Sequence, residues 1–209
     1  MLKRAAVGLD RVRPARPGVV VLLYHRVGRR STVEVDLPRG LFGEQMGALA
    51  GRAVTLDDAL TALEGPPPAA PPPVVVTFDD GTADFVDEAL PVLVDHAVPA
   101  VLYAATAFVE EARPFPDAGR PASWAGLADA VSTGLVTIGS HTHTHVLLDR
   151  ADPDEVTQEL DRSRKLIEDR LGVPALHFAY SKAVPGSPAA EQAVRQRFRS
   201  AALAGTRAN

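Results

Sequence analysis

The sequence predicts an α/β protein built on a mainly parallel sheet. Short runs of β-branched and aliphatic residues alternate along the chain with amphipathic, helix-like patterns. The two most distinctive polar clusters each follow one of these apolar runs directly, and α/β sheets and barrels place their sites at the carboxyl ends of strands. With 209 residues the chain is long enough for one domain with a real core. We therefore expect a single domain over residues 1–209, in which residues 1–17 form a flexible arm.

The composition excludes several classes of partner and site. Hydrophobic residues make up 46% of the chain, charged residues 23%, and the net charge is −4, which gives no electrostatic case for nucleic acid or an anionic membrane. Because there are no cysteines, a metal could be held only by His, Asp or Glu. No apolar run approaches a membrane span, and the amino terminus lacks the apolar core of a signal peptide. We expect a cytoplasmic protein, although a secreted chain trimmed of its leader would look the same.

Six apolar runs predict the strands of the sheet. The run 74–78, three valines followed by Thr and Phe, has the character of a fully buried parallel strand. The six predicted strands cover residues 18–24, 74–78, 98–104, 135–140, 175–180 and 200–204.

Helical patterns with recognisable ends lie between these runs. Thr55 is a predicted N-cap for a helix over residues 56–63, and Asp152 followed by Pro153 opens a long helix that ends at Gly172. A proline-rich stretch over residues 66–73 predicts a stiff connector within the domain. Four further helices are predicted within residues 41–51, 85–94, 124–134 and 189–198, and polar loops are expected after residue 28 and over residues 105–123.

The first polar cluster is Asp79-Asp80-Gly81, directly after the strand 74–78. Neighbouring side chains at a strand end point in different directions, so one carboxylate can bind a metal while the other transfers protons. Gly81 permits a tight turn away from the sheet. Taken alone, the pattern is more typical of a simple turn after a strand.

The second cluster, His141-Thr142-His143-Thr144-His145, follows the strand 135–140. A metal that keeps one position open for water needs about three protein ligands, and Asp80, His141 and His145 would supply them. Histidines four residues apart share one face of a helical turn, so both could reach one ion. A metal there would polarise a carbonyl group and lower the pKa of bound water, with Asp79 as the base. This chemistry is metal-assisted hydrolysis of an amide or ester.

His143 fits this scheme less well. On a continued strand it would share a face with His141 and His145, whereas on a helical turn it would not, and we expect it to lie outside the metal site. The alternative for the whole cluster is a polar loop whose histidines are only solvated.

Several of these residues resemble a known family. Thr77-Phe78-Asp79-Asp80-Gly81 resembles the first motif of the polysaccharide deacetylases (NodB homology, carbohydrate esterase family 4), and the stretch 140–145 resembles their second motif, His-Ser/Thr-x-x-His. The early Tyr24-His25 pair is most similar to the branch that acts on poly-N-acetylglucosamine. Further similarity lies in Ser123-Trp124, Glu159-Leu160 and Phe178-Ala179-Tyr180.

The resemblance implies a distorted (β/α)7-type barrel that removes N-acetyl groups from amino sugars with zinc, or with cobalt or nickel in its place. It implies Asp79 as the catalytic base and Asp80, His141 and His145 as metal ligands. His25 becomes the candidate general acid, because that branch takes its acid from an early histidine; the alternative is that His25 merely caps a strand end. The resemblance also points to four substrate-binding residues, namely Trp124, Tyr180, Ser181 and Lys182.

Three departures from the family pattern matter. Ser181-Lys182-Ala183 replaces a Pro-Tyr-Gly loop that helps to form the acetyl pocket, and no arginine there orients the base. The chain stops at Asn209, where relatives continue, so we expect a barrel that is incomplete or open at its C-terminal seam. Such an open edge favours a homodimer.

From the two clusters and the family resemblance together, we expect an N-deacetylase of a glycan or glycoconjugate. The alternatives are another metal-dependent C–N hydrolase and a non-catalytic carbohydrate-binding homologue.

Overall fold

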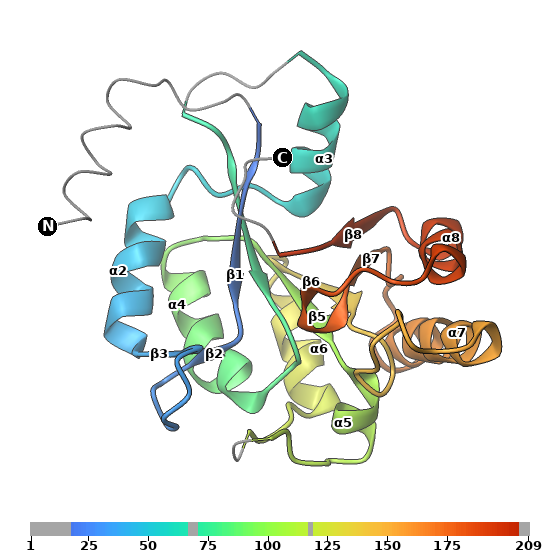
Figure 1. The fold of residues 1–209 in the computed structure, drawn as a ribbon. Helices are drawn as coiled ribbons and strands as arrows, with labels where there is room; N and C mark the ends of the chain where they lie inside the picture. The colour runs from blue at the N-terminus through green and yellow to red at the C-terminus, as the bar shows by residue number, and fades with distance from the viewer. Residues whose placement is uncertain (1–17, 67–70, 117–118, 205–209) are drawn as a thin grey trace, which may run out of the picture.

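The computed structural model describes residues 18–66, 71–116 and 119–204. These residues form a curled, six-stranded parallel sheet in the order β1-β4-β5-β6-β7-β8, with helices packed along it (Figure 1). The predicted α/β class is confirmed, and each predicted strand is present. The bounds are β1 Val20–Tyr24, β4 Val74–Phe78, β5 Ala100–Ala104, β6 Val136–Ser140, β7 His177–Ala179 and β8 Ser200–Ala202.

The sheet is open between β1 and β8. Among the described residues, each of these two strands pairs with one neighbour, β1 with β4 and β8 with β7. The family resemblance implied about seven barrel strands, and the described residues supply six to this half-barrel. The predicted arm over residues 1–17 and the middle of the proline-rich connector, residues 67–70, lie outside the described residues.

Helices fill the intervals between the strands as the sequence predicts. They are α2 Arg39–Leu49, α3 Leu56–Glu64, α4 Leu90–Asp95, α6 Trp124–Ser132, α7 Pro153–Leu171 and α8 Pro188–Arg197, with a π-helical turn over Phe85–Ala89 before α4. The predicted caps are confirmed: the side chain of Thr55 accepts from Asp58 N, that of Asp152 accepts from two amides of the first turn, and Gly172 ends α7 at a φ of 67°.

Two features differ from the sequence-based expectation. The structure has a short helix, α5 Thr106–Glu110, in the segment expected to be a loop. It also has two short paired strands, β2 Arg26–Val27 just before the polar loop expected after residue 28 and β3 Asp36–Leu37 within it. Elements of two to five residues are too short to show a period. The turn between β2 and β3 depends instead on Asp36, whose carboxylate accepts the amides of Arg29 and Ser31 at 2.7 and 2.8 Å.

Packing in the core holds the carboxyl ends of β1 and β4 in place. Strands β4 and β5 are buried along their whole length, as is typical of central parallel strands. Phe78, the last residue of β4, contacts the rings of Tyr24, Phe42 and Phe85 at centroid distances of 4.9 to 5.7 Å. These contacts hold the carboxyl ends of β1 and β4 together, directly before the residues predicted to be functional.

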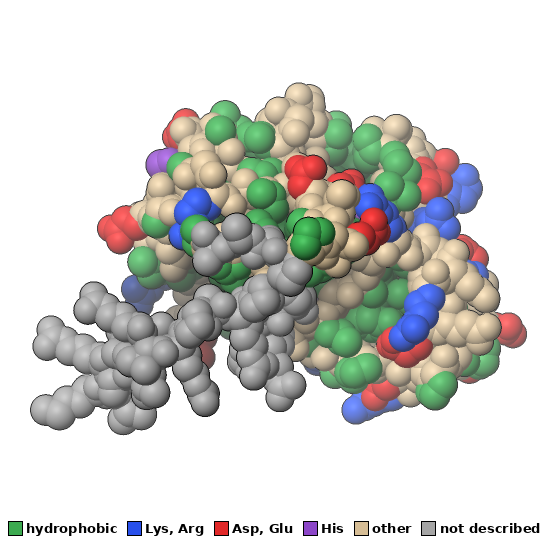
Figure 2. Space-filling view, turned by 90° about the horizontal axis from the view of Figure 1, so that it is seen from above, with side chains coloured by type: hydrophobic (Ala, Val, Ile, Leu, Met, Phe, Trp, Pro, Cys, Tyr) green, Lys and Arg blue, Asp and Glu red, His purple; other side chains and the backbone are tan. Residues whose placement is uncertain are grey.

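The distribution of charged side chains on the surface agrees with the small net charge of the chain. On the face shown in Figure 2, basic side chains are interspersed with acidic ones and do not form an extended patch among the described residues. Among the helices that the structure describes, none combines the length and the apolar character that crossing a membrane requires.

Candidate metal centre

The turn after β4 separates the two neighbouring carboxylates. Asp80 and Gly81 both have left-handed backbones, with φ angles of 75° and 92°. A β-carbon at position 81 would lie 3.4 Å from the β-carbon of Ala104, so glycine also lets the turn pack against the end of β5. The carbonyl oxygen of Asp80 accepts from the amide of Ala105 at 2.9 Å. The turn is thereby fixed, with Asp79 close to His25 and His141 and Asp80 close to His141 and His145.

The histidine segment after β6 is a loop, neither a continued strand nor the helical turn that the four-residue spacing of His141 and His145 allows. Thr142 and His145 adopt left-handed backbones, with φ angles of 63° and 65°, which no helical turn contains. The loop begins where the amide of His141 donates to the carbonyl oxygen of Ala104 at 3.0 Å. Contacts with neighbouring elements, rather than helical spacing, bring His141 and His145 together.

Asp80, His141 and His145 form the candidate metal centre. Asp80 Oδ1 lies 3.4 Å from His145 Nε2 and 3.8 Å from His141 Nε2, and one potential ligand atom from each residue lies within 4.8 Å of the others. Donor atoms bound to a tetrahedral ion at about 2.1 Å are roughly 3.4 Å apart. One carboxylate and two imidazoles at this spacing therefore fit a divalent transition metal.

The state of His141 suits metal binding. Its Nδ1 lies 2.9 Å from the carbonyl oxygen of Ala179, an acceptor, so Nδ1 carries the proton and Nε2 presents its lone pair towards Asp80. Burial, reinforced by nearby His145, lowers the pKa of His141 to about 4. The imidazole is therefore neutral at pH 7, as a ligand must be.

Asp79 lies beside this centre, close to His25 as well as to the ligand candidate His141. Its Oδ2 is 3.9 Å from Nε2 of His25 and 4.0 Å from Nε2 of His141. Its Oδ1 is buried and has no hydrogen-bond partner within the described part of the chain. Burial, with a smaller contribution from the charge of Asp80, raises the pKa of Asp79 to about 8. In its ionised form, Asp79 has an unused oxygen that can accept a proton from water.

His143 is not part of the candidate metal centre. Its Nδ1 lies 2.9 Å from Oγ1 of Thr106, and its carbonyl oxygen accepts from the amide of Ala107 at 2.8 Å. The loop thus directs His143 towards α5 and away from Asp80, in keeping with our expectation that it lies outside the site.

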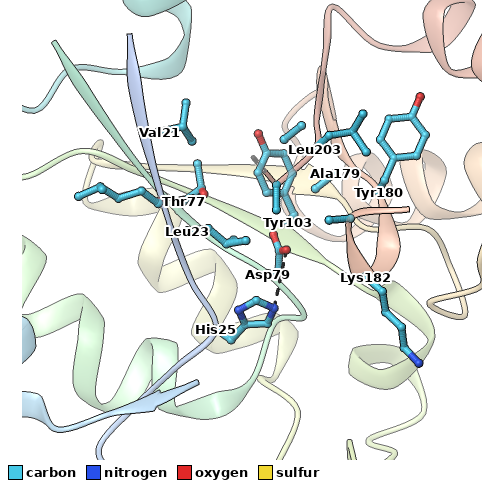
Figure 3. Close-up of a pocket in the computed structure, with 14 residues that line it drawn as sticks. Val21, Leu23, His25, Thr77, Asp79, Tyr103, Ala179, Tyr180, Lys182 and Leu203 are labelled. Atoms are coloured by element: carbon cyan, nitrogen blue, oxygen red, sulfur yellow. Dashed lines mark hydrogen bonds and ion pairs between the residues drawn. The ribbon is translucent and has the colours of Figure 1, made fainter. Parts of the chain in front are cut away.

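A cleft of about 450 Å³ opens beside Asp79, inside the half-barrel (Figure 3). His25, Asp79 and Lys182 line its polar end, and Figure 3 shows the imidazole of His25 directed at the carboxylate. Tyr180 also contributes to the wall, so two of the four predicted substrate-binding residues lie there. The rest of the lining is largely apolar and includes Val21, Leu23, Thr77, Tyr103, Ala179 and Leu203.

The other two predicted substrate-binding residues do not line the cleft. Trp124 lies at the start of α6, where its indole Nε1 donates to Oε2 of Glu110 at 2.7 Å and its ring packs against the core. Ser181 is buried beneath the turn that follows Tyr180. Both were inferred from family resemblance, and neither side chain is directed into the cleft.

The altered loop 181–183 has an unusual backbone. Lys182 and Ala183 are both left-handed, with φ angles of 53° and 54°, which costs a non-glycine residue about 1–2 kcal/mol. The amides of Ala183 and Val184 donate to the carbonyl oxygens of Tyr180 and Ser181, and these hydrogen bonds stabilise this conformation. The loop therefore forms a tight turn at the cleft although none of its three residues is a glycine.

Comparison with known proteins identifies the family. The sequence model of the polysaccharide deacetylases matches residues 67–199, which span β4, the histidine loop and α8. The chain belongs to the polysaccharide deacetylase family. The matched residues include both polar clusters noted in the sequence. No curated protein sequence matches the chain.

Several solved structures of polysaccharide deacetylases share the fold. IcaB from Ammonifex degensii is 26% identical over 88% of this chain and 82% of its own, with a TM-score of 0.77. The deacetylase PplD from Streptococcus pyogenes is 22% identical over 87% of this chain and 81% of its own, with a TM-score of 0.74. A de-N-acetylase from Aggregatibacter actinomycetemcomitans is 20% identical over 86% and 85%, with a TM-score of 0.71. The last two comparisons bear on the fold alone.

Proposed function

We propose that this protein is a metal-dependent hydrolase that removes the N-acetyl group from an N-acetylamino sugar in a glycan or glycoconjugate. Membership of the polysaccharide deacetylase family supports the reaction class. The observation that carries the proposal is the convergence of Asp80, His141 and His145 beside a cleft lined by Asp79 and His25. The names of two similar structures, a deacetylase and a de-N-acetylase, agree with it.

Asp80, His141 and His145 would hold the ion, with zinc as the expected metal and cobalt or nickel as substitutes. When bound, such a metal would polarise the amide carbonyl and lower the pKa of a water molecule. The neutral imidazoles and the single carboxylate leave at least one coordination position free for that purpose.

Asp79 and His25 would carry the proton transfers. Asp79 would take a proton from the attacking water, since Oδ1 has no other partner among the described residues. His25, whose Nε2 lies 3.9 Å from Oδ2 of Asp79, would protonate the departing amine nitrogen. Both residues border the cleft, so one bound amide could be within reach of the base and of the acid.

The test is an acetate-release panel run on the metal-loaded protein and on protein treated with a chelator. The panel holds oligomers of N-acetylglucosamine with different linkages, monomeric N-acetylamino sugars and small non-sugar acetamides. Metal-dependent acetate release from the sugars would support the proposal. Turnover of small amides alone would favour another C–N hydrolase, and sugar binding without turnover would favour a non-catalytic homologue whose loop 181–183 no longer supports the reaction.

A further inference from the structure

Helix α7 carries a buried acid that the proposed reaction does not use. Glu159 is only 8% exposed, and it lies on the same buried face of α7 as Val156, Leu160 and Ser163. Glutamate is almost never buried this deeply unless it has partners. A charged residue on the apolar face of a helix is visible in the sequence, but its partners are not.

Within the described part of the chain, the hydrogen-bond partners of the Glu159 carboxylate belong to the histidine loop. Oε2 accepts hydrogen bonds from the amides of His143 at 2.8 Å and Thr144 at 2.7 Å, and Oε1 accepts from the hydroxyl of Thr144 at 2.9 Å. One turn further along α7, Oγ of Ser163 lies 2.7 Å from Oγ of Ser140, the residue before His141. Helix α7 therefore holds the loop at its start and at its middle.

The loop needs such support because its backbone is unfavourable. Thr142 and His145 have left-handed backbones although neither is a glycine, a conformation that is strained for residues with a β-carbon. The two amides that Glu159 accepts lie between these residues, and hydrogen bonds to a carboxylate are about twice as strong as neutral ones. On the opposite side, α5 donates the amide of Ala107 to the carbonyl oxygen of His143.

We propose that Glu159 is a positioning residue for the metal centre: by binding the amides of His143 and Thr144, it holds the loop in the one conformation that directs both His141 and His145 at Asp80. Its two carboxylate oxygens are taken up by the loop, so it acts through the ligands and does not bind the ion. This inference rests on the proposed metal site.

The test uses two substitutions of Glu159, one that moves the carboxylate and one that removes its negative charge. Glu159→Asp keeps the charge but withdraws the carboxylate by about one carbon–carbon bond, roughly 1.5 Å, so both amides lose their acceptor. Glu159→Gln loses the charge but keeps the contacts, because its amide oxygen can accept both amides while its NH₂ group donates to the hydroxyl of Thr144. The matched control is Glu168→Gln on the same helix, where an exposed glutamate pairs with Arg164 at 3.5 Å.

The measurement is the dissociation constant for Co²⁺, from the visible absorption of each metal-free protein during titration. We expect Glu159→Asp to weaken binding about 10- to 100-fold and to alter the absorption bands, as is typical when an outer partner of a metal ligand is lost. Glu159→Gln should stay within about threefold of the wild type, and Glu168→Gln should match it. A role in folding alone would lower thermal stability without changing the affinity or the bands.

Each other result would overturn the proposal. Wild-type affinity in Glu159→Asp would show that the contacts do not position the ligands. Weakening in Glu159→Gln that equals or exceeds that in Glu159→Asp would show that keeping the contacts is not enough to position the ligands. Failure of the wild type itself to bind Co²⁺ would overturn the proposed metal site as well, which distinguishes the two failures.

Discussion

The backbone amide of Asp79 donates a hydrogen bond of 3.0 Å to the carbonyl oxygen of Tyr24. Tyr24 and Phe78 are the last paired residues of β1 and β4, so this bond extends the ladder just beyond both strands. The residues that follow, His25 and Asp79, are consequently held side by side although they are far apart in the sequence. The register of β1 and β4 thus places the proposed acid beside the proposed base. Because they are two different residues, each role can be tested by its own substitution.

Replacing His25 should impair amide hydrolysis more than ester hydrolysis. We expect His25→Gln to lower kcat/KM for an N-acetylamino sugar by about 10²- to 10⁴-fold, because the amine must be protonated as it leaves. An aryl acetate with an acidic phenol leaves without a proton, so its hydrolysis should fall far less. Steady-state kinetics on both substrates test this; an equal loss on both would show that His25 acts in binding or in strand-end structure rather than as the acid.

Replacing Asp79 should remove turnover while the metal stays bound. Asp79→Asn has nearly the same volume but cannot accept the proton of the attacking water, so we expect acetate release to fall by about 10²- to 10⁴-fold. Metal content, measured on the same sample by mass spectrometry, should remain that of the wild type, since Asp79 is not among the three clustered ligands. Unchanged turnover would rule out Asp79 as the base.

The location of the site was predictable from the sequence because each site residue follows a recognisable strand. The runs 74–78 and 136–140 are apolar and β-branched, and parallel strands bring their carboxyl ends to one edge of a sheet. Asp80 and the histidine loop therefore had to lie near each other. The family motifs then indicated which of these residues would be ligands.

The conformation of the histidine loop was not predictable in the same way. It depends on Glu159 and Ala107, which approach from two helices, and α5 was not predicted at all. Local spacing left a continued strand, a helical turn and a loop all open, whereas these long-range hydrogen bonds stabilise a loop with left-handed backbones at Thr142 and His145. Likewise, Trp124 was assigned to the substrate by analogy, but its indole bonds to Glu110, a residue of the unpredicted helix.

Removing one histidine ligand should release the metal. In His141→Ala, only Asp80 and His145 remain of the cluster, which is too few ligands for a stable site of this kind. We expect about one zinc, cobalt or nickel ion per wild-type chain after loading and dialysis, and close to none in the variant. The matched control is His143→Ala, which should retain the metal because the structure directs His143 at Thr106. Equal metal content in wild type and His141→Ala would refute the site.

A methyl group at position 139 should destabilise the sheet next to the site. A β-carbon on Gly139 would lie 2.6 Å from Cδ1 of Tyr103 and 2.8 Å from the carbonyl oxygen of His177, closer than atoms can approach. We expect Gly139→Ala to lower the free energy of unfolding by about 1–3 kcal/mol, as is usual for overpacking. The control is Gly40→Ala in α2, where a β-carbon meets no atom within 4 Å and should stabilise the helix by up to about 1 kcal/mol. Urea unfolding of both variants, compared with wild type, tests this.

His177 should make the fold sensitive to acid. The ring is buried on β7, with Nδ1 2.9 Å from Oγ of Ser200 and Nε2 3.5 Å from Oδ1 of Asp57, and Arg199 pairs with the same aspartate. Burial lowers the pKa of His177, with Asp57 acting in the opposite direction. The unfolded chain therefore takes up a proton at this residue before the folded chain does.

The sign of the effect follows from this difference. The stabilisation is fully present above the unfolded pKa of about 6.5 and is lost as the pH falls towards the lower pKa of the folded state. Between pH 7.5 and pH 5, the free energy of unfolding should therefore fall more steeply for wild type than for His177→Gln, which can still bond to Ser200 but does not titrate. The comparison cancels the contributions of the site histidines, which are shared by both proteins. Urea unfolding at several pH values measures the two slopes, and parallel curves would show that His177 does not contribute to the acid sensitivity.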